Sequence, residues 1–133
     1  MRKRLLDTSV LIQYWRRQSR DQGLERATPA DVERWAQELA KLHRTNAIAT
    51  PVVIEFLAGT KNSHELTLAR AFLSQFHVAD AGDVRADDWV ERRRLAERVP
   101  RDGKPRHLGD CLVKAIARRL KYDVQTLDRR FPV

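Results

Sequence analysis

The sequence predicts an α/β fold in which a parallel sheet is flanked by helices. Short apolar runs alternate along the chain with longer stretches that have helical spacing. Strands that are separated by helices pair in parallel, because each helix carries the chain back to the edge where the previous strand began. The chain has 133 residues, with no internal repeat and no low-complexity segment. Residues 1–133 are therefore expected to form a single domain.

Four apolar runs are expected to be strands. The first belongs to the segment LLDTSVLI, in which Asp7 interrupts an otherwise apolar stretch. Because an unpaired buried charge is costly, this segment is expected to divide into a strand that ends at Asp7 and a helix that follows it. The four expected strands cover residues 3–6, 46–49, 75–80 and 123–128.

The longer stretches between these runs are expected to be helices. Thr8 or Ser9 can cap the first of them. Thr28-Pro29 and Thr50-Pro51 each place a capping residue before a proline, which suits the first turn of a helix, and the third helix is expected to stop near Gly59. The six expected helices begin near Thr8, Thr28, Thr50, Asn62, Asp83 and Asp110.

The aromatic residues and the single cysteine have structural explanations. Trp15, Trp35 and Trp89 could stack on nucleic-acid bases, but packing in the core or at an interface is the expected use of such residues. Cys111 is expected to be a small buried residue, since one cysteine provides no disulfide framework.

The charge of the chain points to a polyanionic partner. Lysine and arginine number 26 against 18 acidic residues, which gives a net charge of +8. Nucleic acid is the expected partner, and the simpler alternative is that the charge serves solubility. The amino terminus is basic and then apolar, but Asp7 and Gln13 break its apolar part, so it does not have the form of a signal peptide. We expect a cytoplasmic protein without a membrane partner.

Four acidic residues are expected to meet at one edge of the sheet. Asp7 and Asp128 end strands, whereas Glu55 and Asp110 lie near the starts of helices. In parallel sheets, ligand sites lie outside the carboxyl ends of the strands, where helices also begin. Taken singly, Asp110 could be a first-turn acid and Asp128 a turn residue. Together the four residues predict an acidic site.

Such a site is expected to bind one or two Mg²⁺ or Mn²⁺ ions. Grouped carboxylates repel one another unless cations lie between them, and oxygen ligands favour these metals. Zinc is not expected, because the chain has one cysteine and its histidines have no ligand spacing. Carboxylate-bound metals suit hydrolysis of a phosphodiester. Arg16, Arg17 and Arg106 are candidate contacts to the phosphates of a nucleic-acid substrate.

Four segments of the chain resemble the signature segments of PIN-domain ribonucleases. They are LLDTSVLI, TPVVIEFLAGT, GDCLVKAIARRL and TLDRRF, and the likeness is closest to VapC-like toxins of type II toxin–antitoxin modules. The resemblance implies a four- or five-stranded parallel sheet in a three-layer sandwich, although only residues 129–133 remain for a fifth strand. It implies catalytic and metal-binding roles for Asp7, Glu55, Asp110 and Asp128, with supporting hydroxyl groups on Thr8, Ser9 and Thr126.

The function implied by the resemblance is that of a metal-dependent endoribonuclease that acts as a toxin. Such toxins form homodimers, and a small antitoxin protein inserts into the acidic pocket. Two alternatives stay open, namely a PIN nuclease of RNA processing that is not a toxin, and a catalytically silent RNA-binding module. Phosphoaspartate chemistry is disfavoured, because Ser9 stands two residues after Asp7, where an acid is needed, and no lysine follows Asp128.

Overall fold

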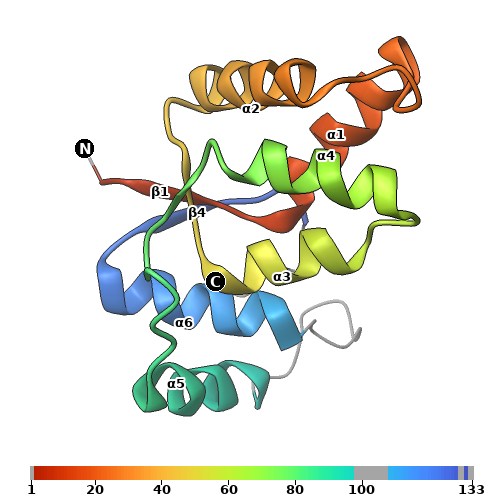
Figure 1. Ribbon diagram of the computed structural model, residues 1–133. Coiled ribbons are helices and arrows are strands. Elements are labelled where there is room, and N and C mark those ends of the chain that lie inside the picture. Colours follow the sequence, from red (N-terminus) through yellow and green to blue (C-terminus); the bar gives the residue numbers. More distant parts are fainter. Residues whose placement is uncertain (1, 98–107, 129–130, 132–133) are drawn as a thin grey trace.

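The computed structural model describes residues 2–97, 108–128 and 131, and these residues form six helices and four short strands (Figure 1). All four predicted strands form, but each has only two or three residues. The elements in chain order are β1 (Arg4–Leu6), α1 (Thr8–Gln22), α2 (Pro29–His43), β2 (Ala47–Ile48), α3 (Thr50–Ala58), α4 (Ser63–Leu73), β3 (His77–Val78), α5 (Ala86–Ala96), α6 (Leu108–Leu120) and β4 (Asp123–Gln125).

The prediction of a four- or five-stranded sheet in a three-layer sandwich is wrong. The described part of the chain is mostly helical and contains two separate parallel pairs, β1 with β4 and β2 with β3. β1 and β2 contact each other, and the hydroxyl of Thr45, just before β2, donates to the carbonyl of Arg4 in β1 at 2.8 Å. A side-chain hydrogen bond therefore connects β1 to the segment before β2, and the two strands are not paired through their backbones. A fifth strand within residues 129–133 lies almost wholly outside the described residues.

β1 and β2 nevertheless have buried side chains on both of their faces. Along β1, Leu5 and Leu6 point to opposite sides and belong to different apolar clusters. Ile48 and its neighbour Ala47 divide in the same way along β2. This alternation is the two-residue period of extended backbone. Figure 1 shows α2 and α4 on one side of the strands and α6 and α5 on the other.

The larger cluster lies among α1, α2, α3 and α4 and is built on aromatic rings. Trp15 contacts Trp35, Phe56 and Phe72 edge to face, with ring centroids 5.1–5.6 Å apart. The prediction of core packing is confirmed for Trp15 and Trp35 but not for Trp89, which is 51% exposed on α5. Cys111 is buried, as predicted.

The starts of the helices differ in how their free backbone N–H groups are satisfied. α2 begins as predicted, since the Thr28 side chain accepts from the backbone N–H of Asp31 and the Asp31 carboxylate accepts from that of Thr28. Capping of α1 by Thr8 or Ser9 was a wrong prediction. Asp7 takes the extended cap position, and both hydroxyl residues lie inside the helix. Thr50 likewise lies inside α3 and does not cap it.

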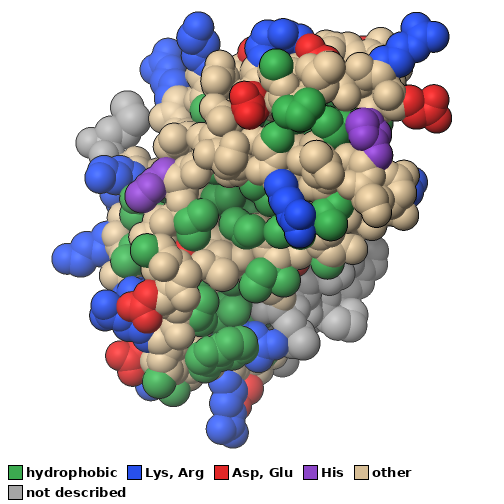
Figure 2. All heavy atoms as spheres, viewed as in Figure 1, with side chains coloured by type: hydrophobic (Ala, Val, Ile, Leu, Met, Phe, Trp, Pro, Cys, Tyr) green, Lys and Arg blue, Asp and Glu red, His purple; other side chains and the backbone are tan. Residues whose placement is uncertain are grey.

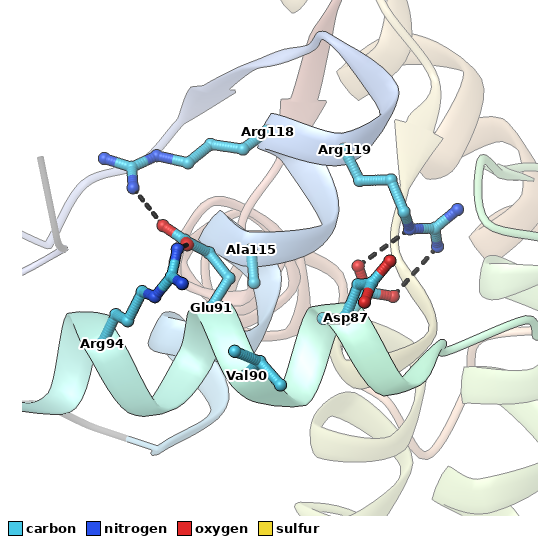
Figure 3. A pocket seen from close by; sticks show the side chains of 8 residues that line it. Asp87, Val90, Glu91, Arg94, Ala115, Arg118 and Arg119 are labelled. Carbon is cyan, nitrogen blue, oxygen red and sulfur yellow. Dashed lines mark hydrogen bonds and ion pairs between the residues drawn. The ribbon is translucent and has the colours of Figure 1, made fainter.

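Charged side chains of α5 and α6 pair across the contact between the two helices (Figure 3). The carboxylate of Asp88 accepts two hydrogen bonds from Arg119, at 2.8 and 3.0 Å, and Asp88 is 2% exposed. Glu91 forms ion pairs with Arg118 and Arg94. On the face drawn in Figure 2, Lys and Arg side chains are scattered and do not form one basic patch.

Candidate acidic site at the strand ends

Asp7 is held at the end of β1 by contacts with the end of β4. Its backbone N–H donates to the carbonyl of Gln125 at 2.9 Å. Its side chain is 1% exposed, and the carboxylate oxygen Oδ2 accepts hydrogen bonds from the hydroxyls of Ser9, at 3.0 Å, and Thr126, at 2.8 Å. The predicted supporting positions of Ser9 and Thr126 are thus next to Asp7.

The same two hydroxyl groups also tie down the segment that leads to Asp128. The Ser9 hydroxyl accepts from the backbone N–H of Leu127, and the Thr126 hydroxyl accepts from that of Asp128, both at 3.0 Å. Thr8 behaves differently, because its hydroxyl is buried and has no hydrogen-bond partner within the described residues. The network leaves the second carboxylate oxygen of Asp7, Oδ1, buried and likewise without a partner in that part of the chain.

Asp110, in the first turn of α6, is strongly perturbed by its surroundings. It is 7% exposed. Burial is the main reason that the pKa of its carboxyl group is raised to about 7, followed by repulsion from Asp7, Asp128 and Glu55 and a hydrogen-bonding interaction with Asp128. These interactions mean that α3, α6 and the ends of β1 and β4 bring all four predicted acids into one neighbourhood.

Glu55 reaches this neighbourhood from α3 and lies against the start of α6. A β-carbon placed on Gly109 would be 1.7 Å from Oε1 of Glu55, so the carboxylate fills the space beside this glycine. α3 and α6 are in direct contact. The side chain of Glu55 is partly buried, although it lies on the helix among the apolar residues Ile54 and Phe56.

A divalent cation fits the donors of this site, although the site is not a preformed cage. Within residues 2–97, 108–128 and 131, no three acidic, histidine or cysteine side chains are arranged to hold a metal ion. However, Oδ1 of Asp7 and Oδ2 of Asp110 are both buried without a hydrogen-bond partner in those ranges. Buried polar atoms ordinarily have partners, and carboxylate oxygens are the ligands that Mg²⁺ and Mn²⁺ prefer.

The two described arginines that were predicted to contact phosphate are not part of this arrangement. Arg16 and Arg17 are exposed on α1, two to three turns after Asp7. Arg106 lies outside the described residues.

One acidic residue with a clear role was missed at the sequence level. Asp80 follows β3, is 4% exposed, and accepts hydrogen bonds from the backbone N–H and the hydroxyl of Thr50, at 3.1 and 2.9 Å from Oδ1. It therefore caps α3, the helix that carries Glu55, from a different segment of the chain. The rule that selected Asp7 and Asp128, an acid at the carboxyl end of a strand, also applies to Asp80.

The pocket in Figure 3 lies between α5 and α6 and contains none of the four acids. Its three arginine residues are all paired with acidic residues of α5, so these cations are already engaged within the protein.

No protein-family model matches the chain, and no curated protein matches it. In the described ranges, no helix is both long enough and apolar enough to cross a membrane.

Proposed function

We propose that the protein is an Mg²⁺- or Mn²⁺-dependent endoribonuclease. The observation that carries this proposal is the meeting of Asp7, Glu55, Asp110 and Asp128, expressed in the raised pKa of Asp110. Structural acids are normally paired with cations or donors, whereas the pKa of Asp110 is raised by burial and by the three acids around it. The resemblance of their four segments to PIN-domain ribonucleases and the net charge of +8 support the choice of RNA as substrate.

In this proposal, the acids differ in their duties. Asp7 and Asp110 would hold the ion through the buried oxygens that have no hydrogen-bond partner within the described residues, and Glu55 and Asp128 would complete its surroundings. Ser9 and Thr126 fix the orientation of Asp7, because both bind the same carboxylate oxygen and leave the other one available. When bound, the ion would lower the pKa of a coordinated water and offset the charge that develops on the phosphate.

The test is cleavage of RNA by the purified protein with Mg²⁺, with Mn²⁺ and with a chelator. Asp7→Asn and Asp110→Asn are expected to lower the cleavage rate by more than about 100-fold, since changes to groups that merely support metal ligands already cost 10–100-fold. Asp21→Asn, which removes one exposed charge near the end of α1, is the matched control and is expected to be fully active. Full activity of Asp7→Asn in the presence of chelator would overturn the proposal.

The cellular role that we propose is that of a toxin, and this part rests on the resemblance to VapC-like toxins. It entails a homodimer and a small antitoxin protein that blocks the acidic site. Expression of the wild-type chain is expected to arrest growth, whereas Asp7→Asn is expected to be tolerated at the same protein level. Equal toxicity of the two forms would contradict the role, and sedimentation that finds only monomer at high concentration would contradict the dimer.

A further inference from the structure

The space beside Gly109 is occupied by the carboxylate of Glu55. A β-carbon at position 109 would lie 1.7 Å from Oε1, 2.9 Å from Cδ and 3.7 Å from Oε2 of that side chain. Real β-carbons essentially never come within 3.0 Å of such atoms. Any other residue at this position would therefore push the Glu55 carboxylate away from its present place.

The backbone of Gly109 does not itself call for glycine. The residue lies in the first turn of α6, and it is not among the described glycines with positive φ, which are Gly23 and Gly82. Alanine would stabilise an ordinary helical position by about 0.5–1 kcal/mol relative to glycine. Glycine at position 109 therefore lowers helix stability relative to alanine, and it leaves space for the Glu55 carboxylate.

The other described glycines lack this relationship. Gly23 and Gly82 have a φ of +78° and nothing within 4 Å of an added β-carbon, so their role is conformational. At Gly59, which ends α3, an added β-carbon would make ordinary contacts of 3.6 and 3.7 Å with backbone oxygens. Gly109 is the described glycine whose missing side chain is replaced by a site residue.

We propose that Gly109 is a positioning residue that lets the Glu55 carboxylate lie against the start of α6, next to Asp110. This role rests on the proposed function, because it concerns the same acidic site. Glu55 also acts on Asp110 electrostatically, so the two carboxylates belong to the same acidic site. Asp80 holds the first turn of α3 in place. The absence of a β-carbon at position 109 allows Glu55 of α3 to approach α6 closely.

The direct test is Gly109→Ala, examined by Mn²⁺ titration calorimetry and by RNA cleavage. The blocked atom is the end of a flexible side chain, which can turn aside, so the variant is expected to fold with an unchanged or raised melting temperature in chelator. Its Mn²⁺ affinity and its cleavage rate are expected to fall 10–100-fold, the usual effect of disturbing the support of a metal ligand. Gly59→Ala, a glycine change on the helix that carries Glu55, is the matched control and is expected to bind Mn²⁺ as the wild type does.

A double-mutant cycle separates positioning from a general disturbance of α6. In Glu55→Ala, the clash disappears with the carboxylate, so adding Gly109→Ala is expected to cause no further loss of Mn²⁺ affinity. An equal loss in both backgrounds, or wild-type affinity in Gly109→Ala, would overturn the role of Gly109 alone. A wild-type protein that neither binds Mn²⁺ nor cleaves RNA would instead overturn the proposed function, and the positioning role with it.

Discussion

The two sides of the molecule are held together by different interactions. Among α1 to α4, Trp15, Phe56 and Phe72 pack in a buried aromatic cluster. On the opposite side, Leu95 is the one fully buried apolar residue of α5, and the helix relies on the Asp88–Arg119 ion pair. Apolar burial is insensitive to direction, whereas a bidentate ion pair fixes an orientation. The aromatic side therefore provides stability, whereas the ion pair sets the orientation of α5 against α6.

The acidic site lies where these two sides meet. α6 contacts α3, which belongs to the aromatic side, and also α5. It carries Asp110 in its first turn and Arg119 near its end. Substitutions on the two sides are therefore expected to change stability by different amounts. Four substitutions follow, from the largest expected effect on stability to the smallest.

The largest effect is expected for Phe72→Ala. Phe72 is fully buried and contacts three other aromatic rings. Its truncation is expected to lower the free energy of unfolding by about 3–5 kcal/mol, because it removes buried area and leaves a cavity. Urea denaturation measures the loss. Ile54→Ala, at an apolar side chain that is 61% exposed, is the control and is expected to change stability by less than about 0.5 kcal/mol.

The next effect is expected for Asp88→Ala on the α5 side. It leaves the Arg119 guanidinium without its main partner, and breaking a buried pair costs about 3 kcal/mol or more. Hydrogen exchange is expected to show the loss chiefly in α5. Replacing both partners, as Asp88→Leu with Arg119→Met, is expected to restore most of the stability. Glu97→Ala, which breaks an exposed ion pair with Arg93, is the control. If Asp88→Ala loses no more stability than Glu97→Ala, the Asp88–Arg119 ion pair is not important for stability.

In the acidic site, where the two sides meet, Asp110→Asn is expected to stabilise the metal-free protein in a pH-dependent way. The pKa of Asp110 is about 7 in the folded protein and near its ordinary value of 3.8 in the unfolded chain. The unfolded state therefore releases this proton first, so the wild type loses stability as the pH rises from about 4 to 7 and stays weakened above 7. At pH 8 in chelator, thermal unfolding is expected to show a gain of about 2–4 kcal/mol. At pH 4 the gain should nearly vanish, and an equal gain at both pH values would refute the electrostatic cause.

The smallest effect is expected for Thr126→Val, which removes one of the two hydroxyl donors to Asp7. A loss of about 1 kcal/mol is expected, since Ser9 still donates to the same oxygen. The backbone N–H of Asp128 loses its acceptor in the same variant. Thr67→Val, at an exposed helical threonine whose hydroxyl bonds only to a carbonyl of its own helix, is the control. Calorimetric melting at neutral pH compares the two.

The sequence was most informative where the signal is local. An acid that interrupts an apolar run led to Asp7, and the Thr28 cap could be recognised from four neighbouring residues. The stop of α3 at Gly59 is local in the same sense. The closeness of Asp7, Asp110 and Asp128 was predicted from the rule that ligand sites lie at the carboxyl ends of parallel strands. This rule needs only the order of the elements along the chain.

The sequence was least informative where distant segments set the outcome. Whether β1 and β2 share a ladder depends on a spacing of a few ångströms between them, which apolar pattern does not encode. The cap of α3 comes from Asp80, 30 residues further along the chain. The exposure of Trp89 follows from the ion pairs that turn the charged face of α5 inward. The closeness of Gly109 to Glu55 depends on how two helices cross.

The hydrogen bond between Thr126 and Asp7 joins residues 119 positions apart. During translation, Asp7 is therefore made well before its partner strand β4. A growing chain therefore holds an incomplete acidic site until β4 has emerged. For an enzyme proposed to cut RNA, this order of synthesis would keep the messenger and the ribosome that produce it away from a finished active site.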